Sequence, residues 1–273
     1  MEIIAEVGLN HYGSLDLACK YIKAISDFGA DTAKFQMHVP AKEHNAPLRV
    51  GMAGIRDRVD LWEKTAFTPD EWKYLIEVCQ RYEVDFLASV FCPEAIDILF
   101  ELGVRRFKVP SGQLTNESLL GALAASSEEV LLSTGLHPLD EVEDAVMALL
   151  EPPTTLSREA ITVLECCTAY PTRPDQIDLY HAFADGLSDH SGTIYPGLVA
   201  CWRELRTLEV HVIFDKQMGG PDAEASLDFI QLGELVDGCR FLGTMMQSPT
   251  HDEIVDREGV RGLRKLFVPS ELE

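Results

Sequence analysis

The chain has 273 residues, 46% of them hydrophobic and 25% charged, with a formal net charge of −22. This length is usual for one α/β barrel and long for a two-layer domain. The acidity argues against nucleic acid and against anionic membranes as partners, because both are themselves negatively charged. An enzyme for an anionic substrate would therefore have to concentrate its few cations inside a pocket.

Strand-like apolar runs alternate with helical patterns along the whole chain. The runs are expected at 3–8, 32–36, 84–90, 106–109, 130–134, 161–166, 186–188 and 208–214. Ser14 is a plausible N-cap for the first helix, and residues 68–71 read as a capping box with proline at the first helical position. A loop of about thirty residues, 37–67, separates the second strand from this box. Helices around 227–236 and 254–266 complete the pattern.

This alternation predicts a parallel sheet, and eight strand–helix units predict a closed (β/α)8 barrel. An open doubly wound sheet is the alternative, but no GxGxxG motif follows any expected strand. The sequence has no linker, low-complexity segment or short-period repeat. A single domain over residues 1–273 is therefore expected.

The sequence favours a cytoplasmic location. Met1 leads directly into a strand-like run, so no signal peptide is expected. No run reaches the roughly 18 consecutive apolar residues of a membrane helix. The seven cysteines include no CxxC pair, which indicates reduced thiols and no zinc ribbon.

Polar residues stand at or just beyond the end of every expected strand. In chain order they are Glu6, Asn10, His11, Lys34, Gln36, His38, Ser89, Lys108, Ser111, Gln113, Ser133, Thr134, Cys166, Thr168, Tyr170, Ser188, Asp189, His190, His211 and Asp222. Taken singly, a strand lysine is more often ion-paired, and a lone histidine is usually structural. The carboxyl ends of barrel strands converge on one face, however, so these groups are expected to share a pocket.

The composition of this pocket indicates its chemistry. Two lysines, Lys34 and Lys108, together with serine hydroxyls, suit a phosphate or carboxylate ligand. His190 and His211 come from adjacent strands and could share a metal that keeps open positions. Two histidines with oxygen ligands favour a manganese-like divalent ion over structural zinc. Glu6 could act as an acid or base near that metal.

The same residues lie in short sequence motifs that resemble those of the sialic acid synthase family. The motifs are AEVGLNHYGS (5–14), KFQ (34–36), KVPSG (108–112), LSTGL (132–136), YPT (170–172), GLSDH (186–190) and GPD (220–222). They occur in the family's order and cover about residues 2 to 230. Together they form a specific signature.

The resemblance implies a (β/α)8 barrel that condenses phosphoenolpyruvate with an N-acetylated amino sugar or related aldose, giving a 2-keto-3-deoxy sugar acid and phosphate. It implies that His190 and His211 hold the metal, with Mn²⁺ expected and Mg²⁺ or Co²⁺ as alternatives. It assigns phosphoenolpyruvate to Lys34, Lys108, Ser111, Ser133 and Ser188, with Ser89 and Thr168 as further substrate contacts. Glu6, Gln36, Tyr170 and Asp222 are expected to face the sugar or metal, and family barrels form homodimers.

Departures from the family pattern leave two alternatives open. The family's C-terminal antifreeze-like domain is expected to be absent, since the sequence ends at Glu273, and a separate protein could replace it. Gln113 stands at a catalytic position where the family has glutamate, and an amide cannot take a proton. A metal-dependent aldolase or lyase, or a non-catalytic binding paralogue, therefore remains an alternative. The loop 37–67 is either a lid over the pocket or a plain surface insertion.

Overall fold

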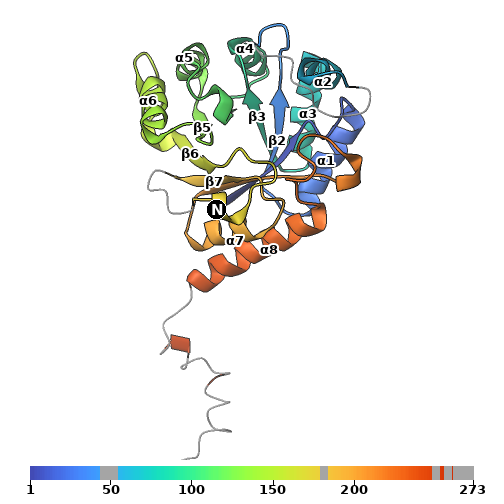
Figure 1. Ribbon diagram of the computed structural model, residues 1–273, viewed down its shortest axis with the longest axis vertical. Coiled ribbons are helices and arrows are strands. Elements are labelled where there is room, and N and C mark those ends of the chain that lie inside the picture. Colours follow the sequence, from blue (N-terminus) through green and yellow to red (C-terminus); the bar gives the residue numbers. More distant parts are fainter. Residues whose placement is uncertain (44–54, 179–183, 248–252, 255–259, 261–273) are drawn as a thin grey trace, which may run out of the picture.

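The computed structural model describes residues 1–43, 55–178, 184–247, 253–254 and 260, and the structural statements below refer to them. Its strands form one closed parallel barrel in chain order, with β8 pairing with β1. Figure 1 shows helices packed around these strands. The strands are β1 Glu2–Gly8, β2 Thr32–Met37, β3 Asp85–Val90, β4 Arg106–Val109, β5 Glu129–Ser133, β6 Ile161–Cys166, β7 Gly186–Asp189 and β8 Thr207–His211. The predicted (β/α)8 barrel is confirmed.

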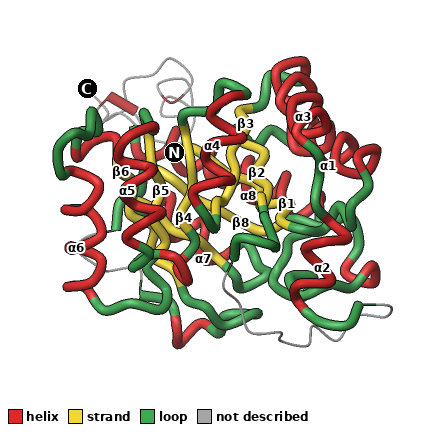
Figure 2. The backbone as a smooth tube through the Cα atoms, turned by 90° about the horizontal axis from the view of Figure 1, so that it is seen from above, coloured by secondary structure: helices red, strands yellow, loops and turns green. Residues whose placement is uncertain are grey.

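Helices surround the strands (Figure 2). They are α1 Leu15–Asp27, α2 Arg58–Thr65, α3 Pro69–Arg81, α4 Pro93–Glu101, α5 Glu117–Ser126, α6 Leu139–Leu150, α7 Tyr195–Trp202 and α8 Phe229–Met246. Local signals start several of them. The Ser14 hydroxyl accepts a hydrogen bond from the Leu17 amide at 3.2 Å, and Thr68 and Glu71 form the expected capping box. These caps satisfy amide groups that have no partner within the helix.

The inside of the barrel is layered. Ile4, Leu87, Leu131 and Leu164 form a completely buried apolar cluster. Because strand side chains alternate between two faces, residues two positions further along also point inward. Glu6, two residues after Ile4, lies opposite Lys34 on β2 and His211 on β8. A layer of buried polar groups therefore stands above the apolar layer, at the carboxyl end of the strands.

Three details differ from the sequence prediction, and a fourth falls largely outside the described residues. The connection 37–67 contains helix α2, which forms because Leu61 and Trp62 pack against Leu9. The alternation predicts a helix between the strands 161–166 and 186–188, but the described residues there form only a short 3-10 turn, Pro174–Gln176. Strand β8 ends at His211 instead of residue 214, because Val212 pairs with Leu227 outside the barrel. Most of the expected helix 254–266 lies outside the described residues.

Across the part of the chain that the structure describes, no helix is both long enough and apolar enough to span a bilayer.

Candidate active site

A pocket opens at the carboxyl end of the barrel, where sequence analysis placed the chemistry. Its lining consists of Glu6, Lys34, Gln36, Ser89, Phe91, Lys108, Pro110, Ser111, Ser133, Cys166, Tyr170, His190, Glu209, His211 and Asp222. Eleven of the fourteen predicted site residues are in this lining. The strands bring these side chains together from every part of the barrel, which supports a single site.

Three predicted residues do not line the pocket. Ser188 lies beneath it and donates a hydrogen bond to Glu209 at 2.9 Å. The Thr168 methyl group packs over Gly135, so closely that a Cβ atom there would come within 2.8 Å of it. Gln113 accepts a hydrogen bond from the Asn116 side chain at 2.8 Å and lines a neighbouring hollow. The structure thus separates Gln113 from the central pocket, and its catalytic role stays a prediction.

A buried ion network occupies the floor of the pocket. The ammonium group of Lys34 lies 3.0 Å from one carboxylate oxygen of Glu6 and 3.0 Å from one of Glu209. Lys108 reaches the other oxygen of Glu209, also at 3.0 Å. Burial of unpaired charge is costly, so these groups stabilise one another through direct contact.

The network sets the protonation of its members. Burial opposes the charge of Lys34, but Glu209 and Glu6 outweigh it and raise its pKa. Burial wins at Lys108, whose pKa is lowered despite the attraction of Glu209. Burial likewise opposes the charge of Glu209, but the two lysines hold its pKa well below the usual range. Glu209 is therefore ionised and shared between two cations.

Glu209 was missed by the sequence analysis. It precedes His211 by two positions in β8, so the two side chains share the inward face of the strand. That spacing was the available signal. A glutamate in the middle of an expected strand, with only 1% of its side chain exposed, requires cationic partners.

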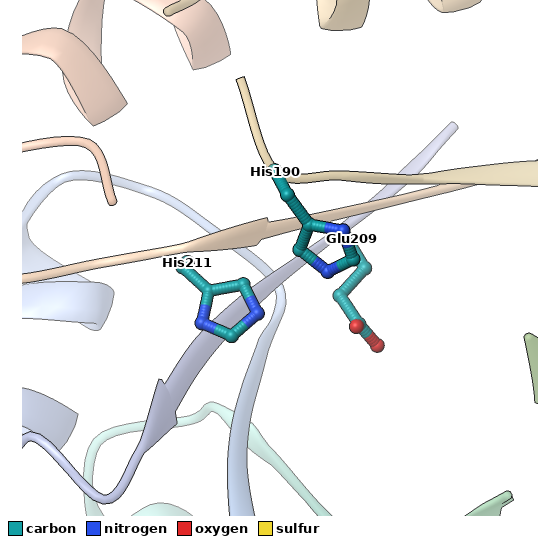
Figure 3. A group of neighbouring side chains, drawn as sticks. All are labelled: His190, Glu209 and His211. Carbon is teal, nitrogen blue, oxygen red and sulfur yellow. The ribbon is translucent and has the colours of Figure 1, made fainter. Parts of the chain in front are cut away.

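His190, Glu209 and His211 form a group whose possible ligand atoms lie within 4.8 Å of one another (Figure 3). His190 follows β7, whereas Glu209 and His211 come from β8. Burial lowers the pKa of each histidine to about 3, so both rings are neutral and each keeps a nitrogen lone pair. Neutral imidazole is the form that binds metal.

The surroundings of the histidines also fit a metal. His190 Nδ1 donates to the carbonyl of Cys167 at 2.7 Å, which leaves Nε2 as the lone-pair nitrogen, 2.9 Å from the Tyr170 hydroxyl. A hydrogen bond of this kind fixes the orientation of many metal-binding histidines. His211 Nδ1 is buried and has no hydrogen-bond partner among the described residues. Two imidazoles beside a carboxylate suit a first-row divalent ion.

The rim of the pocket carries groups that can hold protons. Asp222 lies 3.7 Å from His211 Nδ1, and burial together with the nearby charge of Glu6 raises its pKa to about 7. Burial and the neighbouring Cys166 raise the pKa of Tyr170, whose ring stacks on His190 with centroids 4.2 Å apart. Near neutral pH the tyrosine keeps its proton, and Asp222 can either hold or release one.

The Ser133 hydroxyl could serve a ligand. It is buried and has no hydrogen-bond partner within the described part of the chain, although it lines the pocket beside Lys108 and Ser111. A buried hydroxyl without a partner carries a desolvation cost that a bound acceptor would relieve. These hydroxyl and ammonium groups give one side of the pocket a chemistry that suits an anion, next to the histidine pair.

Fold and site together define a class: a (β/α)8-barrel enzyme whose pocket combines ammonium and hydroxyl groups suited to an anion with a histidine pair compatible with a metal. The sequence profile of the NeuB family matches residues 21–251, and the chain belongs to this family. It is 35% identical over 240 residues to the N,N'-diacetyllegionaminic acid synthase of Campylobacter jejuni, covering 83% of this chain and 71% of that protein. It is 31% identical to the N-acetylneuraminate-9-phosphate synthase of Mus musculus, covering 91% of this chain and 72% of that protein.

Solved structures agree with this assignment. An N-acetylneuraminic acid synthetase from Leptospira borgpetersenii superposes with a TM-score of 0.79 at 27% identity, covering 96% of this chain and 92% of that one. A truncated 3-deoxy-D-arabino-heptulosonate 7-phosphate synthase from Thermotoga maritima shares the fold, with a TM-score of 0.67 at 14% identity over 90% of this chain and 87% of that one. The resemblance inferred from the motifs is confirmed at the level of the family.

Proposed function

We propose that the protein condenses phosphoenolpyruvate with the aldehyde of an N-acetylated amino sugar or a related aldose. The products are a 2-keto-3-deoxy sugar acid and inorganic phosphate. One observation carries the proposal: two buried lysines joined through Glu209 stand beside a neutral histidine pair in a single pocket. The first group suits the anionic donor, and the second suits a metal that activates the acceptor. The synthases named among its relatives support this reading.

Lys34, Lys108, Ser111 and Ser133 would hold the phosphate and carboxylate of phosphoenolpyruvate. Without substrate, the two lysines are balanced by Glu6 and Glu209. An arriving anion competes with these carboxylates for the ammonium groups, while Ser133 offers a hydroxyl that has no other partner among the described residues. Charge-assisted hydrogen bonds of this type are the strongest in proteins.

His190 and His211 would bind the divalent metal, which we propose to be Mn²⁺, with Mg²⁺ or Co²⁺ as alternatives. Such an ion supplies Lewis-acid polarisation of the acceptor's aldehyde. Tyr170 and the Cys167 carbonyl fix the ring of His190, so that its lone pair stays directed into the pocket. Because both rings are neutral, no proton has to leave them before a metal binds.

The reaction forms one carbon–carbon bond and breaks one bond to the phosphate. C3 of phosphoenolpyruvate attacks the aldehyde carbon, water adds at C2, and phosphate leaves as the keto group forms. The aldehyde oxygen needs a proton, and Asp222, with its pKa of about 7, can deliver one. Glu6 and Gln36 lie on the same side of the pocket and would contact the acceptor's hydroxyl groups.

The test is phosphate release from phosphoenolpyruvate in the presence of Mn²⁺. The acceptor panel comprises N-acetylated amino sugars, their 6-phosphates and simple aldoses, with the sugar acid identified by mass spectrometry. Release with one acceptor establishes the reaction and names the substrate. Metal-loaded protein that neither binds phosphoenolpyruvate nor releases phosphate with any acceptor contradicts the proposal. Pyruvate release without phosphate would instead identify the aldolase alternative.

We also propose a cytoplasmic homodimer. The cysteines within the described residues are all free thiols, which suits a reducing compartment. The dimer follows from the resemblance to the sialic acid synthases. Light scattering on the purified chain tests it, and a monomeric mass at micromolar concentration would contradict it.

A further inference from the structure

His38 lies just outside the central pocket, at the end of β2, and its environment is unusually constrained. Its ring is stacked between Trp62 of α2 and Phe91, which follows β3, with centroid distances of 4.3 and 4.0 Å. The two interplanar angles are 15° and 25°, so the three rings are nearly parallel. Only 3% of the His38 side chain is exposed. The ring plane is therefore fixed from both sides.

A buried glutamate fixes the rotation of the ring within that plane. His38 Nδ1 lies 2.9 Å from one carboxylate oxygen of Glu43, whose side chain is 1% exposed. The other oxygen of Glu43 accepts a hydrogen bond from the Val39 amide at 2.7 Å. A carboxylate buried this deeply is held in place by its partners, not by solvent.

The opposite edge of His38 faces the active site. His38 Nε2 lies 3.4 Å from the side-chain oxygen of Gln36. The amide nitrogen of Gln36 donates to Glu6 at 2.9 Å, and Glu6 in turn contacts Lys34 at 3.0 Å. A continuous chain of polar contacts thus runs from Glu43, through His38 and Gln36, to the ion network of the pocket.

Only one assignment of hydrogen-bond donors and acceptors fits this series of contacts. The Glu6 carboxylate only accepts hydrogen bonds, so Gln36 directs its amide nitrogen toward Glu6 and its oxygen toward His38. His38 Nε2 must then carry a hydrogen. Burial lowers the pKa of His38, and the hydrogen bond and charge of Glu43 oppose that effect. The geometry thus predicts a hydrogen on Nε2 that is directed at the Gln36 oxygen.

We propose that His38 and Glu43 form a positioning pair that holds the Gln36 amide, and through it Glu6, in the orientation used by the acceptor side of the pocket. Neither residue lines the pocket itself. Without the pair, the Gln36 amide could rotate and direct its oxygen at Glu6, which would push the two acceptors apart. The inference rests on the proposed function for its kinetic readout, but the hydrogen at Nε2 is independent of it.

Two matched substitutions separate positioning from packing. His38→Phe keeps an aromatic ring between Trp62 and Phe91 but removes the N–H, whereas His38→Gln keeps an N–H donor and loses the stacked ring. We expect His38→Phe to lower kcat/KM for the acceptor by about 10- to 100-fold, the usual range for residues that orient a metal-site shell, with KM for phosphoenolpyruvate within about twofold. His38→Gln should restore most of this loss. The proposal is wrong if His38→Gln lowers kcat/KM more than His38→Phe does. It is also wrong if the kinetics for the acceptor and for phosphoenolpyruvate change equally.

A second measurement does not depend on activity. The ¹⁵N NMR spectrum of the imidazole nitrogens, assigned by comparison with His38→Gln, should show a protonated Nε2 in the wild-type protein. A bare Nε2 overturns the inference even if every acceptor is turned over. If the wild type releases no phosphate with any acceptor, the proposed function fails, while the NMR result still decides the positioning pair. Should His38→Phe not fold, Glu43→Gln with the same NMR readout replaces it.

Discussion

Lys34 and Glu209 form a 3.0 Å ion pair inside the barrel, with side chains only 2% and 1% exposed. Glu209 also contacts Lys108, so a single carboxylate neutralises two buried cations. The proposed binding of an anion in this pocket depends on this arrangement, because the lysines can stay charged only while a carboxylate faces them.

Replacing Glu209 with glutamine should destabilise the fold. The change leaves Lys34 paired with Glu6 alone and removes the carboxylate that contacts Lys108, and breaking a buried ion pair typically costs about 3–5 kcal/mol. Urea denaturation at pH 7 measures the free energy of unfolding. Lys20→Ala, which removes a well-exposed ion pair with Asp16, is the control and should have little effect. An E209Q protein as stable as the wild type would mean that the lysines do not depend on Glu209.

Replacing His211 with alanine should abolish tight binding of Mn²⁺. We expect the dissociation constant to rise by on the order of 100-fold or more, since loss of a ligand costs at least as much as loss of an orienting neighbour. Isothermal titration calorimetry measures this directly. His137→Gln is the control, because His137 bonds the Ser111 carbonyl and does not belong to the His190–Glu209–His211 group. Equal affinities for the two variants would exclude the proposed metal site.

Two of the buried serines at the site, Ser133 and Ser188, should respond differently to substitution by alanine. Ser133 has no partner among the described residues, so Ser133→Ala should leave stability unchanged and raise KM for phosphoenolpyruvate by about 10-fold, the value of one charge-assisted hydrogen bond. Ser188 donates to Glu209, so Ser188→Ala should lower the melting temperature. Thermal unfolding and phosphate-release kinetics on both variants test the contrast. Destabilisation by Ser133→Ala would show that its hydroxyl has a structural partner.

Asp222 should make the metal-free protein less stable as pH rises toward 7. Its pKa is raised from 3.8 to about 7 in the folded state, so between these values the folded chain keeps a proton that the unfolded chain has lost. The free energy of unfolding therefore decreases as pH rises from about 4, and above pH 7 it decreases no further through Asp222. Asp189, whose burial raises its pKa to about 6, acts in the same direction. The useful measurement is therefore the wild-type free energy of unfolding minus that of Asp222→Asn.

In chelator-containing buffer this difference should fall steadily from pH 5 to pH 7. A difference that stays constant over this range would show that Asp222 is already ionised in the folded protein.

The order of the strands and the chemistry at their ends could be read from the sequence. Apolar runs bounded by caps such as Ser14 and the 68–71 capping box predict strands and helices, because these signals act within a few residues. The family motifs then placed Lys34, Lys108, His190 and His211 in one site. The structure bears out the barrel and brings these four side chains into the same pocket.

What the sequence missed depended on contacts between distant segments. Helix α2 has a local start signal in its Asp57 N-cap but few apolar side chains, and it is held in place by Trp62 stacking on His38 and by Leu61 packing against Leu9. Gln113 follows β4 as predicted, yet the 3-10 turn Ser111–Gln113 directs it into a neighbouring hollow. Local propensity specifies neither the position of helix α2 nor the direction of the Gln113 side chain.

Glu209 shows most clearly which features the sequence determines and which the tertiary structure determines. Its spacing from His211 shows that it points inward, which the sequence alone determines through the period of two in a strand. Its partners Lys34 and Lys108 come from β2 and β4, far away along the chain. Only closure of the barrel decides that these three charges meet, because the register between strands is set by the packing of the whole sheet. The sequence thus determined which chemical groups reach the carboxyl end of the barrel, and the tertiary structure decided which of them touch.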